Sequence, residues 1–146
     1  MGVCTFFGHS NATRELEPRI REVIEHLIRE KHADCFYVGN NGSFDYMVRK
    51  VLKELATKHP HIRYSVVLAY LPQGKDELNI FDYSDTIYPE GLEGVHPRYA
   101  ICKRNEWMIE KADVVVTYVT HDYGGANRYK KLSMRKKKRI IELSVL

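Results

Sequence analysis

The chain has 146 residues, of which 44% are hydrophobic and 29% charged, and its formal net charge is +4. This composition is ordinary for a globular protein, and the length suits one core, so we expect a single domain over residues 1–146. No apolar stretch approaches the roughly 18–20 residues of a membrane span, which argues against a membrane partner. Three widely spaced cysteines without a CxxC pair favour reduced thiols, a cytoplasmic protein and no metal site.

Short apolar runs alternate with segments of helical periodicity along the chain. Residues 70–96 interrupt this pattern with a polar segment containing several glycines and prolines, which is typical of a functional loop or lid; Thr86–Tyr88 is a candidate short strand within it. The other predicted strands are Val3–Phe7, Cys35–Val38, Tyr64–Ala69, Val114–Val119 and Arg139–Leu143, and the predicted helices are about Leu16–Lys31, Asp45–Lys58, Pro97–Lys111 and Ala126–Arg135.

This alternation predicts an α/β fold. We expect one Rossmann-like three-layer domain, with a mainly parallel sheet of about five to six strands flanked by helices. Right-handed crossovers would place helices on both faces of the sheet. Ligands of such sheets bind beyond the carboxyl ends of the strands, near the point where the strand order reverses.

Three predicted strands open into glycine-containing loops before a helical segment, at residues 8–10, 39–43 and 124–126. Glycines let backbone N–H groups approach a phosphate, and the next helix N-terminus supplies partial positive charge. A guanidinium on the preceding helix suits bidentate phosphate contact. Tight turns and a solvated arginine are the structural alternatives. The predicted ligand-binding residues are Gly8, His9, Ser10, Gly39, Asn40, Gly42, Ser43, Arg104, Asn105, Gly124, Gly125 and Ala126.

The irregular segment adds candidate loop contacts. Asp85, Thr86 and Tyr88 are placed to fold over a ligand, and Tyr70 and Tyr83 are candidate stacking faces for a base. The predicted loop contacts are Tyr70, Asp85 and Thr86. The chain has ten tyrosines, and exposed tyrosines suit either a nucleotide pocket or a subunit interface.

Taken in order, these motifs resemble the SLOG superfamily, Rossmann-like domains related to the LOG cytokinin-activating phosphoribohydrolases and the DNA-processing protein DprA. The resemblance is to the small stand-alone DUF1273/YpsA-like SLOG proteins of bacteria and phages. It implies a nucleotide or ADP-ribose-like ligand, no required cofactor and, by analogy, a homo-oligomer. The segments that carry it are GHS at 8–10, GNNGSFD at 39–45, DTIYP at 85–89, RNEWM at 104–108 and GGA at 124–126.

One departure from the LOG pattern bears on activity. The LOG motif PGGxGTxxE ends in the glutamate needed to cleave an N-glycosidic bond, whereas Lys131 stands near that position here. The resemblance therefore implies a protein that senses or sequesters a nucleotide. A phosphoribohydrolase or related N-glycosidase using Asp45, Asp85 or Asp122 is an alternative. DprA-like nucleic-acid binding through the basic run 128–139 is another.

Overall fold

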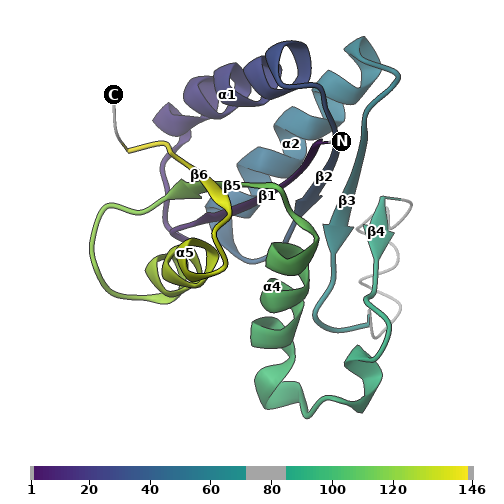
Figure 1. The fold of residues 1–146 in the computed structure, drawn as a ribbon, viewed down its shortest axis with the longest axis vertical. Coiled ribbons are helices and arrows are strands. Elements are labelled where there is room, and N and C mark those ends of the chain that lie inside the picture. Colours follow the sequence, from purple (N-terminus) through teal and green to yellow (C-terminus); the bar gives the residue numbers. More distant parts are fainter. Residues whose placement is uncertain (1, 72–84, 145–146) are drawn as a thin grey trace.

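The computed structural model describes residues 2–71 and 85–144, and it shows a parallel sheet between two layers of helices (Figure 1). Within those ranges the strands are hydrogen-bonded in the order β4-β3-β2-β1-β5-β6, and each neighbouring pair is parallel. This confirms the predicted α/β, Rossmann-like three-layer fold. The strands are β1 (Gly2–Gly8), β2 (Ala33–Val38), β3 (Arg63–Val67), β4 (Thr86–Ile87), β5 (Val114–Tyr118) and β6 (Arg139–Glu142).

Helices cover both faces of the sheet. Strand side chains alternate between the faces, so Phe6 of β1 joins the core under α1 and α2, whereas Phe7 joins the core under α4 and α5. No helix in the described part of the chain has the length and apolar character that a membrane crossing requires. The helices described are α1 (Glu17–Glu30), α2 (Gly42–Lys58), α4 (Ala100–Lys111) and α5 (Gly125–Arg135), with 3-10 turns at Arg14–Leu16, Leu92–Gly94 and Pro97–Tyr99.

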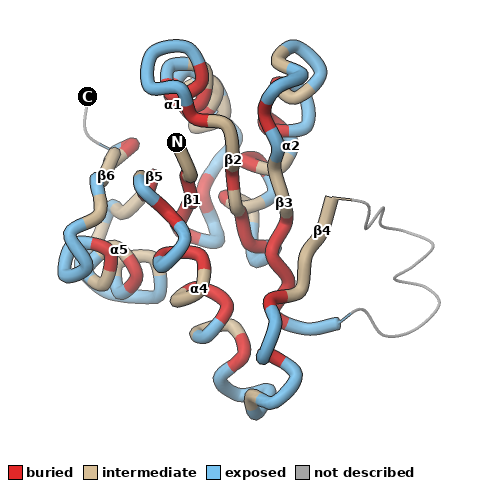
Figure 2. The backbone as a smooth tube through the Cα atoms, turned by 45° about the vertical axis from the view of Figure 1, so that its right-hand side comes forward, coloured by how far each residue is buried: buried red, intermediate tan, exposed pale blue. Residues whose placement is uncertain are grey.

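The periodicity of α1 illustrates why these segments form helices. Ile20, Ile24 and Leu27 recur at three- and four-residue spacing and are buried against the sheet. Pro18 lies in the first turn, where its missing N–H costs no intrahelical bond. Figure 2 shows the result, with buried positions along the strands and on the sheet-facing sides of the helices.

Two predicted helix starts differ from the structure. α2 begins at Gly42, three residues before the predicted start at Asp45. Asp45 instead lies inside the helix and its Oδ2 accepts the N–H of Asn41 at 2.9 Å, which caps the earlier turn. The predicted helix from Pro97 is divided, because a 3-10 turn precedes α4, which begins at Ala100.

The strand order reverses beside β1, and this positions the candidate site. β2, β3 and β4 extend on one side of β1, while β5 and β6 extend on the other. β1 leads into α1 on one face, whereas β5 leads into α5 on the opposite face. The two connections therefore diverge and leave a crevice at the carboxyl edge, where open α/β sheets bind ligands.

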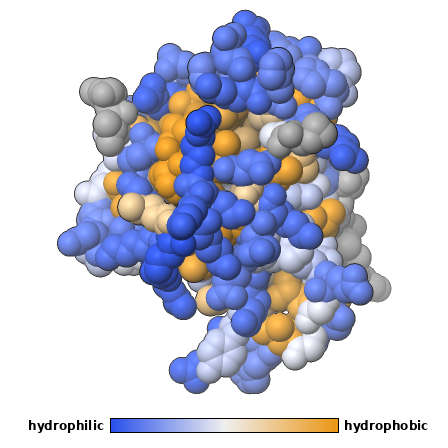
Figure 3. All heavy atoms as spheres, viewed as in Figure 1, coloured by the Kyte–Doolittle hydropathy of each residue, from blue (hydrophilic) through white to orange (hydrophobic). Residues whose placement is uncertain are grey.

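Hydrophilic side chains cover the outer surface of α1, and apolar side chains show between α1 and the β5–β6 end of the sheet (Figure 3). Val114, Tyr118 and Ile141 of these strands are half-buried and pack against the core under α1 and α2. The sheet is therefore covered less completely at this end.

Glu142 fastens β6 to the rest of the fold. Its carboxylate accepts hydrogen bonds from Lys130 Nζ at 2.8 Å, Thr117 Oγ1 at 2.6 Å and the N–H groups of Val119 and Ser144 at 2.9 and 3.1 Å. Burial alone would raise the pKa of Glu142, but these bonds lower it to about 2. The charged carboxylate is thus the form that the fold stabilises.

We expect Glu142→Gln to lower the free energy of unfolding by about 1.5–3 kcal/mol at pH 7, the usual contribution of hydrogen bonds to a charged group. Because folding lowers the pKa from 4.5 to about 2, this stabilisation is complete above about pH 4.5 and is lost as the pH falls towards 2. Urea unfolding at several pH values measures both effects.

Glu22→Gln is the matched control, because the Glu22 side chain is 72% exposed in its ion pair with Arg19. Its effect should stay below about 0.5 kcal/mol. Equal effects of the two substitutions would contradict the role assigned to Glu142.

Candidate functional site

A cavity of about 450 Å³ opens at the carboxyl edge of the sheet, between the ends of β1 and β5 and the helices α4 and α5. Its volume lies in the range of small-molecule sites. Phe6, Phe7, Ile101, Met108 and Tyr129 give it apolar walls. The predicted site residues that line it are Gly8, His9, Ser10, Arg104, Asn105, Gly124, Gly125 and Ala126.

Other predicted residues lie elsewhere. Gly39, Asn40, Gly42 and Thr86 line a smaller neighbouring cavity of about 170 Å³, which shares Asp45 with the larger one. Ser43 lines neither cavity.

The predicted loop contacts do not reach the larger cavity. The Tyr70 hydroxyl donates to the carbonyl of Pro97 at 2.8 Å, and Asp85 pairs with Arg49 at 2.9 Å. Tyr83 lies outside the described residues.

The loop between β2 and α2 is held by contacts within the protein. The N–H of Ser43 donates to the carbonyl of Ser10 at 2.9 Å, and its hydroxyl, with one proton to donate, lies 2.6 Å from the carbonyl of Ala12 and 2.9 Å from that of Ser10. Gly42 has φ +91°, and a Cβ there would lie 2.6 Å from the Cα of Ser10. These donors join two loops, so packing accounts for Gly42 and Ser43 without a ligand.

Arg104 is buried, with only 2% of its surface exposed, so it is not the solvated helix arginine of the structural alternative. Its guanidinium donates to Asn105 Oδ1 at 2.7 Å and to the carbonyl of Val67 at 2.8 Å. It also donates to Asn40 Oδ1 at 3.2 Å and to Asn41 Oδ1 at 2.6 Å. All four acceptors are neutral oxygen atoms, and the neighbouring carboxyl group of Asp45 is the acidic group that interacts with the charge of Arg104.

Asp45 places a carboxyl group between the two cavities. Burial raises its pKa to about 6, although the N–H of Asn41 and the charge of Arg104 both act to lower it. Oδ2 is held by Asn41. Of the three carboxylates that the sequence offers to an enzyme, this is the one that lines the larger cavity.

The N-terminus of α5 faces the larger cavity. Gly124 precedes the helix with φ +91°, a conformation that favours glycine, and no side chain caps the helix. A Cβ at Gly125 would meet no atom within 4 Å. The first N–H groups of a helix lack intrahelical partners and carry partial positive charge, so this open end suits an anion.

Aromatic rings stack beside this helix end. The rings of His9 and His121 lie 3.9 Å apart, and the ring of Tyr123 stacks on His121 at the same distance. His9 Nε2 accepts the N–H of Thr120 at 2.9 Å. Tyr123 is 68% exposed and lines the cavity, so its outer face is open to a second ring.

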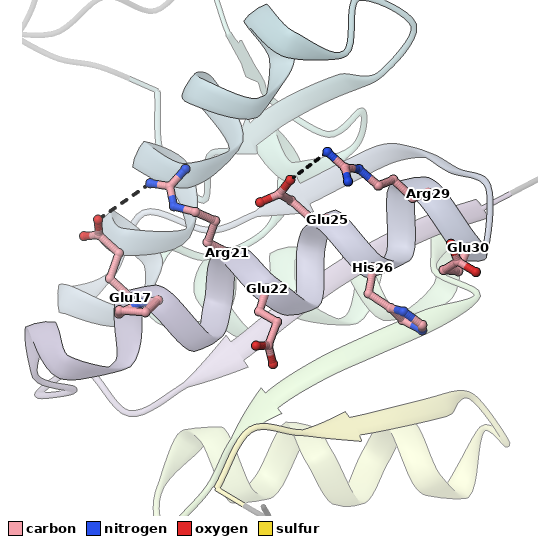
Figure 4. Close-up of a pocket in the computed structure, with 8 residues that line it drawn as sticks. Glu17, Arg21, Glu22, Glu25, His26, Arg29 and Glu30 are labelled. Carbon is pink, nitrogen blue, oxygen red and sulfur yellow. Dashed lines mark ion pairs between the residues drawn. The ribbon is translucent and has the colours of Figure 1, made fainter.

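A separate hollow of about 610 Å³ lies along α1, away from these two cavities. All the residues that line it come from that one helix (Figure 4). Arg21 pairs with Glu17, and Arg29 pairs with Glu25. This is a charged, solvated helix face on which no loops converge. We therefore place the candidate site at the carboxyl edge of the sheet.

Neither the family models nor the curated proteins compared with the chain match it. The resemblance to the SLOG superfamily therefore stays a prediction, and the site is argued from its geometry.

Sequence reasoning missed several lining residues. Asn11, Asn41 and Tyr123 line the cavity together with the apolar side chains of α4 and α5. Tyr123 directly precedes the glycine pair, and Asn41 lies in the loop between Gly39 and Gly42. Their position beside predicted ligand-binding glycines was the sequence signal that could have identified them. The apolar residues carry no local signal, because the same periodicity describes any core-facing helix.

We expect Gly8→Ala to destabilise the protein by about 1–3 kcal/mol, the usual cost of overpacking a core. A Cβ at Gly8 would lie 2.4–2.6 Å from the ring of Phe44, which is fully buried. Gly125→Ala should change stability by less than about 0.5 kcal/mol, because that position is open. Urea unfolding of both variants tests the contrast, and similar losses would show that Gly125 is also packed.

Proposed function

We propose that the protein binds a nucleotide or nucleotide-derived ligand at the carboxyl edge of its sheet, and that it senses or sequesters this ligand. The phosphate lies at the N-terminus of α5 and the base lies against the apolar and aromatic walls of the larger cavity. The proposal rests first on the open, uncapped helix end at residues 124–126, which faces a cavity beside the point of strand-order reversal.

Two further features support an anionic ligand. Arg104 is among the residues that line the cavity, and the hydrogen bonds of its guanidinium go to neutral oxygens. The α5 segment contains no acidic residue to repel a phosphate. The resemblance to SLOG proteins, which these same segments carry in part, implies the same ligand class. The predicted homo-oligomer and cytoplasmic location are retained as predictions.

We expect Gly125→Asp to abolish the stabilisation that AMP or ADP-ribose gives to the wild-type protein. A carboxylate in the first turn favours the helix, so the variant should fold normally while it repels the phosphate. For wild type, ligand at about one hundred times Kd should raise Tm by about 5–10 °C. A thermal-shift assay measures both.

Gly94→Asp is the matched control, because a Cβ at Gly94 also meets no atom within 4 Å; its response to AMP should equal that of wild type. Adenosine, which lacks the phosphate, should shift Tm much less than AMP. An undiminished AMP response in Gly125→Asp would place the phosphate elsewhere. Arg104→Ala is a poorer test, because it also removes the bonds that hold the β2–α2 loop.

Asp45 favours the second candidate function, an N-glycosidase. Its pKa of about 6 suits a general acid near neutral pH, and it lines the cavity. Under the binding proposal we expect no free base when the protein is incubated with AMP, IMP or NAD-type compounds and the mixture is analysed by chromatography. Base release by wild type that is lost in Asp45→Asn would instead establish hydrolysis.

DprA-like nucleic-acid binding has weaker support. Lys130 and Lys136 of the basic run pair with Glu142 and Glu110, which reduces the free positive charge of this surface. A steep decrease of oligonucleotide affinity with salt would favour this reading.

A further inference from the structure

We propose that the neutral form of His9 positions the loop before α5, so that protonation of His9 weakens anion binding at this helix end. The inference rests on the proposed function for the identity of the bound group. It assigns His9 the role of a positioning residue, in place of the ligand contact that the sequence analysis predicted.

The hydrogen bond to Thr120 fixes the proton of His9. A backbone N–H can only donate, so Nε2 of His9 must carry a lone pair, and the proton of the neutral ring is then on Nδ1. His9 follows β1, and Thr120 follows β5. The bond therefore joins the segments that follow these two strands, and it holds the start of the β5–α5 loop against the end of β1.

The ring stack carries this constraint towards the helix end. His121 stacks on His9, Tyr123 stacks on His121, and Nδ1 of His121 lies 3.0 Å from the carbonyl of Tyr123. Gly124 follows directly. Thus His9 holds the start of the loop through Thr120, and the stacking of Tyr123 on His121 holds its end, next to the N-terminus of α5.

The charged and titratable groups around His9 favour its neutral form. Burial and the neighbouring His121 lower the pKa of His9, whereas Glu142 at the end of β6 raises it by a smaller amount. The Tyr118 ring packs edge-on against His9 from β5. Protonation at Nε2 would set two N–H donors against each other, and protonation of both histidines would place two cations 3.9 Å apart.

The sign of the pH effect follows from this geometry. Because the folded pKa of His9 lies below the ordinary value of 6.5, the loop contact is complete above about pH 6.5 and is lost as the pH falls through the lowered value. An imidazolium that contacts a phosphate directly would have the opposite effect, since acid would then strengthen binding.

Sulfate is the probe of choice, because it stays a dianion between pH 5.5 and 8 while phosphate esters titrate there. Calorimetry between pH 8 and pH 5.5 should show wild-type sulfate affinity falling in acid relative to that of a His9 variant that does not titrate. His9→Gln keeps an acceptor at the end of its side chain without a titrating group there, so its affinity should be close to the wild-type value at pH 8. Asp45 lines the same cavity with a pKa of about 6 and titrates in both proteins, so the ratio of wild-type to His9→Gln affinity isolates His9 and should fall in acid. His9→Phe keeps a ring but no acceptor, so its affinity should be low throughout.

His26→Gln is the matched control, since His26 lies exposed on α1, and its pH profile should equal that of wild type. A ratio of wild-type to His9→Gln affinity that stays constant or rises in acid would overturn the proposal.

Nitrogen-15 NMR of the unliganded protein separates this inference from the proposed function. It should show His9 as the Nδ1–H tautomer at pH 8, with the Thr120 amide signal moving as His9 titrates. The Nε2–H tautomer would overturn the inference whatever ligand binds. If His9 has the expected tautomer but the protein binds neither sulfate nor AMP, the proposed function is contradicted, and the predicted effect of His9 on binding is contradicted with it.

Discussion

The buried guanidinium of Arg104 organises the carboxyl edge of the sheet. It joins α4 to the end of β3 and to the loop after β2 through bonds to Val67, Asn40 and Asn41. Removing a cation from water costs several kcal/mol unless its donors are satisfied, so these acceptors must stay in place. A Cβ at Gly39 would lie 2.9 Å from Oδ2 of Asp45 and 3.1 Å from the guanidinium of Arg104, so a side chain here would crowd both groups.

Two of the three glycine-containing loops, the one after β2 and the one before α5, have different roles. The loop after β2 binds the protein itself, through Ser43 and its contacts with Ser10. The loop before α5 leaves its helix end uncapped and open at Gly125. Two glycine-containing loops of similar sequence thus differ in role: the loop after β2 connects two parts of the fold, whereas the loop before α5 forms the candidate phosphate site. Asp45 lies between them, and its raised pKa keeps hydrolytic chemistry as the second candidate.

The sequence predicted the alternation of strands and helices because each element has a local signature, such as the periodicity of α1 or the apolar run in β5. It also placed Gly124 and Gly125 at the correct edge of the sheet. It did not predict that Gly42 packs against Ser10, or that Arg104 binds Asn41, because each partner lies more than thirty residues away in the chain. The start of α2 was predicted three residues too late for a local reason, since Asp45 lies inside the helix and accepts the N–H of Asn41.

The most direct measurement is a titration of the nitrogen-15-labelled protein with AMP, followed through the backbone amide signals. An anion held at the α5 N-terminus should shift the amides of Gly124, Gly125 and Ala126 most strongly. The amide signals of residues 41–43 should shift less, because the N–H groups of Asn41 and Ser43 already donate to acceptors within the protein. The amide signal of Gly94 should not shift. Strong shifts confined to residues 39–43, or no shifts at any AMP concentration, would contradict the account.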